Sequence, residues 1–177
     1  MWSRATRPRI CFGASVGGMR RKYEYRRTLP QYQKDGRALF ITFGTWRRWE
    51  LPEVARDLAL EAFVHAHGRK YNLHAAVVML ITCIWCALRW RTTTDPFSIP
   101  EIMQAIKSES AHRINKALGR GGRVWQDESF DHVLRNDESL NQKIAYVLEN
   151  PVRAGLVGNA LEYGWFWHQP DGSRETA

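Results

Sequence analysis

The longest apolar stretch of the chain, LHAAVVMLITCIWCAL at residues 73–88, decides the fold. It is shorter than the roughly 20 residues that a membrane-spanning helix needs, and it contains the polar residue His74. β-Branched residues favour strands, and the stretch is rich in them: Val77, Val78, Ile81, Thr82 and Ile84. A buried helix of this length would be bounded by residues that end helices and would contain fewer β-branched residues. We therefore interpret the stretch as two consecutive strands.

The sequence before this stretch predicts one strand and one helix. The segment ALFITFGTW at 38–46 combines β-branched and aromatic residues and is typical of a strand. Pro52 stands where a helix begins, and apolar residues at four-residue spacing follow it. We expect this helix to end near His67, where Gly68 stops it.

The sequence after the stretch predicts two further helices and a short strand. Residues 91–97 form a loop, and Ser98 begins a helix that runs to about Leu118. A short strand is expected between residues 124 and 134. The third helix is expected over 137–149 and should stop at Pro151, because proline cannot donate the next helical hydrogen bond.

This order of elements predicts an α+β fold. We expect a ferredoxin-like antiparallel sheet with helices packed on one face, plus a C-terminal helix that carries Tyr146. A length of 177 residues with 44% hydrophobic residues suits one domain, which we place at 19–167. Residues 1–18 and 168–177 are expected to be disordered, and Met19 is an alternative start to Met1.

The charge balance favours a polyanionic partner. The chain has 26 Lys and Arg residues against 18 Asp and Glu residues, a formal net charge of +8. This excess is typical of nucleic-acid-binding proteins. Three cysteines without a framework spacing argue against a disulfide-stapled secreted domain, so we expect a cytoplasmic protein that does not enter a membrane.

Basic residues and tyrosines alternate in the segment at 19–37, which we call the basic arm. Such an arm can grip phosphates and stack on bases. Its candidate DNA-binding residues are Arg20, Arg21, Lys22, Arg26 and Arg27. A solvated basic tail whose tyrosines pack on the domain explains the composition equally well.

Tyr146 and Asn150 lie four residues apart in KIAYVLENPVRAGLV, which places them on one side of a helix. A tyrosine can attack phosphorus as a covalent nucleophile if its proton is lost and the phosphate is polarised. The alternative is a tyrosine that closes the edge of the core.

Four segments together resemble the REP-associated tyrosine transposases, which belong to the single-tyrosine HUH transposases of bacterial insertion sequences. They are HGRKYNLHAAVVM at 67–79, PEIMQAIKSESAHRIN at 100–115, WQDESFDHVLRN at 125–136, and the segment around Tyr146 that continues to Val157. The resemblance covers residues 20–167. It implies cleavage and rejoining of single-stranded or hairpin DNA by a monomer or a homodimer.

The resemblance also implies roles for particular residues. Tyr146 takes the place of the nucleophile, which forms a 5′-phosphotyrosine in the family. Two histidines on the central strand hold a divalent metal, Mg²⁺ or Mn²⁺, and Asn150 takes the place of the polar residue that completes the metal site. The basic arm is similar to the part that helps to recognise hairpins.

The chain departs from the family at the two metal-binding histidines. After AAVVM the family continues with Pro-Asp-His-hydrophobe-His, whereas Thr82 and Ile84 stand at the histidine positions here. Neither side chain replaces an imidazole, and isoleucine has no lone pair to offer. We therefore expect catalysis to be impaired and the metal not to bind normally.

A frameshift would explain this departure. One set of codons that could encode Met79 to Trp85 is ATG CTG ATC ACG TGC ATT TGG, and one frame over these codons would contain GAT CAC GTG CAT TTG, which encodes Asp-His-Val-His-Leu. We hypothesise a one-base deletion near codon 80 and a compensating insertion near codon 95, either real or a sequencing error. The alternative is a selected change.

Other residues of this region could supply a metal site. Cys83 and Cys86 form a lone Cys-x-x-Cys, which is a weak zinc or redox signal without a second pair. The histidines that could rescue a metal site are His74, His112 and His132, although packing in the core or at a sheet edge explains them more simply. The sequence thus leaves open an impaired transposase, a non-catalytic DNA-binding relative and a decaying gene product.

Overall fold

The computed structural model describes residues 38–89, 98–134 and 137–169. At 87–89 and 137–139 it describes the backbone alone. The basic arm, the extension at 1–18 and residues 170–177 lie outside the described residues, as does the loop at 91–97. The predictions made for them stay predictions.

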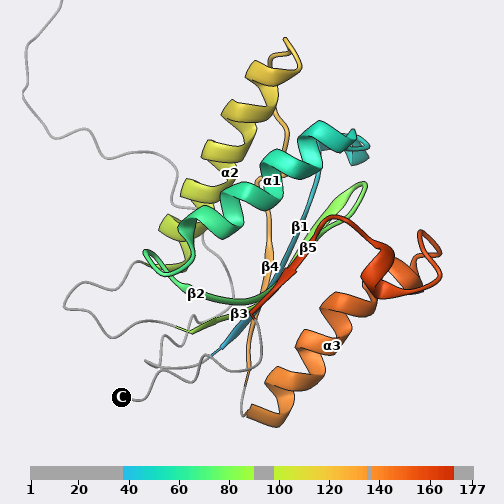
Figure 1. The fold of residues 1–177 in the computed structure, drawn as a ribbon. Coiled ribbons are helices and arrows are strands. Elements are labelled where there is room, and N and C mark those ends of the chain that lie inside the picture. Colours follow the sequence, from blue (N-terminus) through green and yellow to red (C-terminus); the bar gives the residue numbers. More distant parts are fainter. Residues whose placement is uncertain (1–37, 90–97, 135–136, 170–177) are drawn as a thin grey trace, which may run out of the picture. The chain divides into compact units, whose positions relative to one another are not determined.

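The described residues form an α+β fold, as predicted (Figure 1). Its sheet has five strands in the order β4-β1-β3-β2-β5, and every neighbouring pair is antiparallel. The strands are β1 (Leu39–Gly44), β2 (Asn72–Val78), β3 (Thr82–Arg89), β4 (Phe130–Val133) and β5 (Phe166–His168). The helices are α1 (Glu53–Ala66), α2 (Ile99–Ala117) and α3 (Asp137–Arg153), with short 3₁₀ turns η1 (Trp46–Arg48) and η2 (Ala160–Glu162).

The apolar stretch at 73–88 forms β2 and β3, which are joined by a tight hairpin, so the prediction of two strands is confirmed. Met79 N donates to Thr82 O at 2.8 Å and closes this hairpin. The two strands pair over their length, with Val78 opposite Cys83 and Ala75 opposite Cys86. The most apolar segment of the chain therefore lies at the centre of the sheet.

The start of α2 shows the cap that the sequence predicts. The Ser98 side chain accepts a hydrogen bond from Glu101 N, and the Glu101 carboxylate accepts one from Ser98 N at 2.7 Å. This reciprocal pair satisfies two of the helix's unpaired N–H groups. The hydrogen bonds to Ser98 also lower the pKa of Glu101.

The prediction that Pro151 ends the third helix is wrong, because α3 continues through it to Arg153. Proline removes one helical donor, but the following turn keeps its own bonds. Ala154 N donates to Asn150 O and Leu156 N to Pro151 O, both at 2.9 Å. Gly155, at φ 70°, then provides the left-handed residue on which helices often end.

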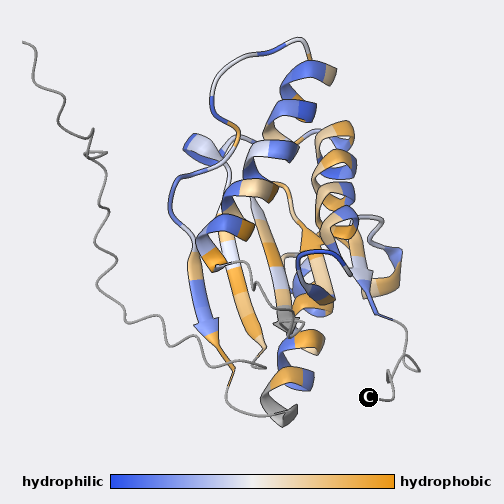
Figure 2. Ribbon diagram, turned by 90° about the vertical axis from the view of Figure 1, so that its left-hand side faces the viewer, coloured by the Kyte–Doolittle hydropathy of each residue, from blue (hydrophilic) through white to orange (hydrophobic). Residues whose placement is uncertain are grey.

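The two faces of the sheet are covered differently (Figure 1). Helices α1 and α2 pack together on one face, and α3 covers the opposite face, which we call the α3 face. Hydrophobic residues run along the central strands, while the helices alternate hydrophilic and hydrophobic residues along their length (Figure 2). Each helix therefore has one apolar side for the sheet.

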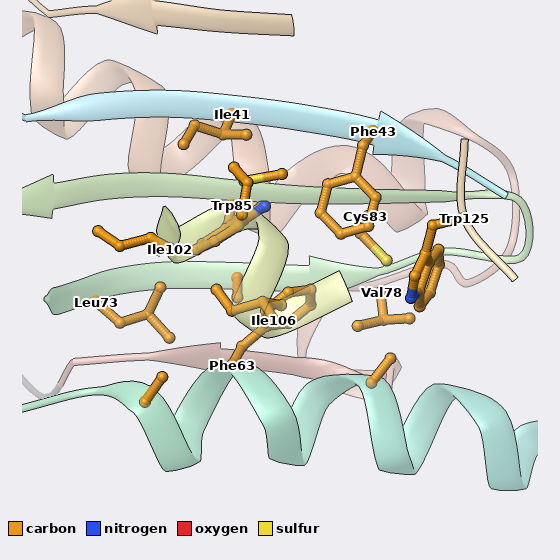
Figure 3. Packing of buried hydrophobic residues seen from close by; sticks show 14 of the residues in the cluster. Ile41, Phe43, Phe63, Leu73, Val78, Cys83, Trp85, Ile102, Ile106 and Trp125 are labelled. Atoms are coloured by element: carbon orange, nitrogen blue, oxygen red, sulfur yellow. The ribbon is translucent and has the colours of Figure 1, made fainter. Parts of the chain in front are cut away.

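Trp85 lies at the centre of the larger core, between the sheet and helices α1 and α2 (Figure 3). Its side chain is 1% exposed, and its ring packs near those of Phe43, Phe63 and Tyr71. Its indole Nε1 has no hydrogen-bond partner. The segment after Met79 therefore supplies one of the two buried tryptophans of this core, the other being Trp125.

Strand β5 is an element that the sequence analysis missed. It adds to the edge of β2, with Val77 opposite Phe166 and Ala75 opposite His168. The Tyr163 hydroxyl donates to Val78 O at 2.8 Å and fixes the segment that leads into it. The tail predicted to begin at residue 168 therefore starts one residue inside β5. Among the described helices, none is long and apolar enough to cross a membrane.

Candidate nucleic-acid site on the α3 face

The two positions at which the sequence resemblance leads us to expect histidines, Thr82 and Ile84, lie on the α3 face of β3. Thr82 and Ile84 are two residues apart, so their side chains point to the same face of the sheet. The register places Gly44 opposite Thr82 and Thr42 opposite Ile84. Ile84 is 7% exposed and packs in the apolar cluster beneath α3, whereas Thr82 is half-buried.

Tyr146 lies in α3 and packs on this same face. Its half-buried ring meets the ring of Phe40 edge-on, with centroids 5.8 Å apart and planes at 69°. Phe40 precedes Thr42 by two residues on β1, and Thr42 pairs with Ile84. The phenol and the two substituted positions therefore share one face of the sheet.

Two cations flank the Tyr146 ring. Lys143 Nζ lies 5.5 Å from the ring centroid, and the guanidinium carbon of Arg153 lies 5.1 Å from it. Lys143 Nζ is also 4.9 Å from the centroid of Phe40. These distances are within the range of cation–π attraction, so both positive charges are held beside the phenol.

Asn150 lies one turn after Tyr146, as the sequence predicts. Its amide Nδ2 donates to the Tyr146 backbone carbonyl at 2.9 Å. The side chains at 143, 146, 150 and 153 follow the three- and four-residue spacing that puts them on one side of a helix. The structure thus brings Asn150 and Tyr146 together.

The residues at the predicted metal site do not fit a divalent metal. The Ile84 side chain has no donor atom, and Thr82 offers a neutral hydroxyl in place of an imidazole. Within the described parts of the chain there is no group of three or more His, Cys, Asp or Glu residues that could hold a metal ion. We therefore assign no step of the chemistry to a metal.

The other candidate ligands do not converge. Cys83 packs with the α1–α2 core and Cys86 with the cluster beneath α3, so the Cys-x-x-Cys thiols point to opposite faces. Burial raises the pKa of Cys86 to about 12 and raises that of Cys83 further. His132 is exposed on β4 and His112 is exposed on α2, while His74 lies in β2.

Sequence reasoning missed Lys143, Arg153 and Phe40 as parts of this site. Helical spacing from Tyr146 was a signal that could have found the two cations, since they lie three residues before it and seven after it. Phe40 is more than one hundred residues away in sequence, and no local pattern connects it with Tyr146. The predicted DNA-binding residues of the basic arm lie outside the described residues.

Among solved structures, the chain is similar to a REP-associated tyrosine transposase bound to a REP hairpin, with a TM-score of 0.62 and 22% sequence identity over 81% of each chain. The chain has the fold of this transposase. A proposed transposase from Deinococcus radiodurans R1 matches with a TM-score of 0.45 and 20% identity, over 76% of this chain and 97% of that chain. No protein-family model and no curated protein matches significantly.

Proposed function

We propose that the chain is a transposase-family protein that binds single-stranded or hairpin DNA, and that strand cleavage is impaired in it. The observation that carries the proposal is the position of the Tyr146 phenol between Lys143 and Arg153. A phosphate that enters this site meets two positive charges and a potential nucleophile together. The fold shared with a transposase bound to a REP hairpin supports the same partner.

The chemistry of the lineage is an attack by tyrosine on phosphorus. The Tyr146 oxygen loses its proton and forms a bond to phosphorus, and the 3′ oxygen of the broken strand leaves, so that the 5′ phosphate stays on the tyrosine. Lys143 and Arg153 would hold the phosphate and offset the negative charge that grows on it. Asn150 would be a positioning residue for the helical turn that carries the phenol.

We expect strand cleavage to be impaired because Thr82 and Ile84 lack the imidazole groups that would hold a metal ion. Polarisation of a phosphoryl oxygen by a metal is worth several kcal/mol, and each ~1.4 kcal/mol is a factor of ten in rate. Two cations near the phenol do not reproduce a charge held directly on the phosphate oxygen. DNA binding does not depend on that charge, because phosphate contacts supply most of the affinity.

The second candidate is a non-catalytic DNA-binding relative. It is favoured by the side chains of Thr82 and Ile84, which offer a metal ion a neutral hydroxyl and no imidazole. In both candidates the basic arm, with Arg20, Arg21 and Lys22, adds phosphate contacts. The strand order β4-β1-β3-β2 supports the ferredoxin-like topology for either. We keep a homodimer as a proposal for both.

Binding of a fluorescent DNA hairpin, followed by anisotropy over a series of salt concentrations, tests the proposal. We expect the full chain to prefer the hairpin to a blunt duplex of the same length, with an affinity that falls steeply with salt. Tyr146→Phe should bind as the native chain does, because it keeps the ring. Equal affinity for the duplex, or no binding by a chain that melts cooperatively, would overturn the proposal.

A further inference from the structure

His67 lies where three elements of the fold meet. It directly follows Ala66, the last residue of α1, and its half-buried side chain contacts both the start of β2 and the short strand β5. Its Nδ1 atom accepts a hydrogen bond from Leu73 N at 2.9 Å. Its ring packs on the ring of Trp167, with centroids 5.0 Å apart and planes at 53°. One imidazole therefore joins the end of α1 to β2 and to β5.

The hydrogen bond from Leu73 N requires a neutral imidazole at His67. Nδ1 accepts only while it carries no proton, so the single ring proton of the neutral form lies on Nε2. A second proton has to enter at Nδ1, where it removes the acceptor. Leu73 is fully buried, so its backbone N–H would then have no partner and no water, which destabilises the closed arrangement. Protonation of His67 and this hydrogen bond therefore exclude each other.

The segments in contact with the His67 ring contain no carboxylate that would stabilise a positive charge. Neither residues 66–78 nor residues 163–169 include an Asp or a Glu. The ionisable side chains on the elements around the ring are His65, Arg69, Lys70, Tyr71, His74, Tyr163 and His168. Glu109 of α2 lies 3.5 Å from His65, measured from its Oε1 to Nδ1. The C-terminal end of α1 favours a cation, but burial lowers the pKa of His67.

Strand β5 has few contacts besides that of Trp167 with His67. It is three residues long, Phe166–His168, and it stands last in the strand order, next to β2. Directly after it, Gln169 N donates to His74 O at 2.8 Å. Short elements with few buried contacts open at the lowest free-energy cost in a folded protein. A change at His67 therefore acts on an element that opens easily.

We propose that His67 is a pH-sensitive latch for β5, closed while the imidazole is neutral and open when it takes up a second proton. In the open form β5 leaves β2, and the backbone N–H and C=O groups at that edge of β2 are free to pair with another strand. The closed form is fully favoured above pH 6.5, the ordinary pKa of histidine, and its advantage is lost as the pH falls below that value.

Hydrogen–deuterium exchange of the full chain, read by mass spectrometry at pH 7.5 and pH 5.5, tests this inference. After correction for intrinsic exchange rates, we expect the opening constant of residues 166–169 to be up to about tenfold larger at pH 5.5, because opening then takes up one proton. The protection of α2 should not change. Equal losses of protection in β5 and α2 would indicate global unfolding and would contradict the latch.

Two variants separate His67 from its neighbours. His67→Asn should make the protection of β5 independent of pH, because Asn Oδ1 stands where Nδ1 stood, accepts from Leu73 N and does not titrate. His65→Gln is the matched control: it removes an exposed histidine of the same helix and should keep the native pH dependence. If His67→Asn keeps the native pH dependence, or if the native chain protects β5 equally at both pH values, the inference is wrong.

NMR of the histidine rings gives a second test on the native chain alone. At pH 7.5 we expect His67 to carry its proton on Nε2, and we expect it to titrate below pH 6.5. A proton on Nδ1 at pH 7.5, or a pKa at or above 6.5, would overturn the inference. These measurements use no DNA, so their outcome is independent of the proposed function.

Discussion

The guanidinium carbon of Arg153 lies 5.1 Å from the centroid of the Tyr146 ring, two helical turns along α3. Because Arg153 is exposed, its charge can reach a phosphate without being buried. We expect Arg153→Met to weaken hairpin binding severalfold and to make the slope of log K against log salt shallower by about 0.9, the effect of one lost phosphate contact. Salt titrations by anisotropy measure both.

Lys143→Met should have the same effect, since Lys143 Nζ lies 5.5 Å from the centroid of the same ring. Lys116→Met is the control: Lys116 is exposed on α2, which covers the opposite face of the sheet. If Arg153→Met, Lys143→Met and Lys116→Met change the salt slope equally, then DNA binding depends on the net charge of the protein and not on a site at Tyr146.

Trp85→Ala should cost about 3–5 kcal/mol of unfolding free energy, the usual range for emptying a buried aromatic site. Trp85→Phe should cost much less, because the lost indole Nε1–H makes no hydrogen bond. Urea unfolding at pH 7 gives both values. If Trp85→Phe were as unstable as Trp85→Ala, the indole Nε1–H would have to make a hydrogen bond in solution.

The centre of the fold could be predicted because its signals are local. The run of β-branched residues predicted β2 and β3, and Ser98 predicted the start of α2. Strand β5 was missed because Phe166–His168 is three residues long, and it forms as a partner for the exposed edge of β2. Pro151 was misjudged because the turn after it supplies its own hydrogen bonds.

Within the candidate site, contacts between residues of one helix could be predicted from the sequence, whereas contacts between different elements could not. The four-residue spacing joined Tyr146 with Asn150, and the same helical rule reaches Lys143 and Arg153. The contact between Phe40 and Tyr146 depends on strand register, which no short sequence pattern encodes.

The thiols of Cys83 and Cys86 should make stability fall at high pH. Burial raises both pKa values, so the thiols stay neutral in the native protein while they ionise in the unfolded chain above about pH 8.5. The stabilisation is complete below that pH and is lost as the pH rises toward the folded pKa values. The unfolding free energy should fall by up to about 1.4 kcal/mol per pH unit for each thiol.

Urea unfolding at pH 8 and pH 10 measures this loss. The variant Cys83→Ala/Cys86→Ala should show a smaller decrease over the same interval, because only the other titrating groups remain. Equal decreases for the variant and the native chain would mean that the two thiols ionise in the folded protein too.

The nucleotide sequence of codons 79 to 96 tests the frameshift hypothesis. We expect the frame that begins at the third base of the Leu80 codon to encode Asp-His-Val-His, followed by a return to the present frame near codon 95. Resequencing the gene then separates a sequencing error from a real deletion. If no shifted Asp-His-Val-His is present, the residues from Leu80 to Asp95 are a selected sequence.

The central claim is that this chain keeps DNA binding and has lost cleavage at Thr82 and Ile84. Its most direct test is the yield of covalent protein–DNA adduct on denaturing gels, with labelled hairpin and Mn²⁺, for the native chain and for Thr82→His/Ile84→His. We predict binding without adduct for the native chain, an adduct for the double variant, and none when Tyr146→Phe is added. An equal adduct at Tyr146 in the native chain, or no adduct from a double variant that folds and binds, would contradict the account.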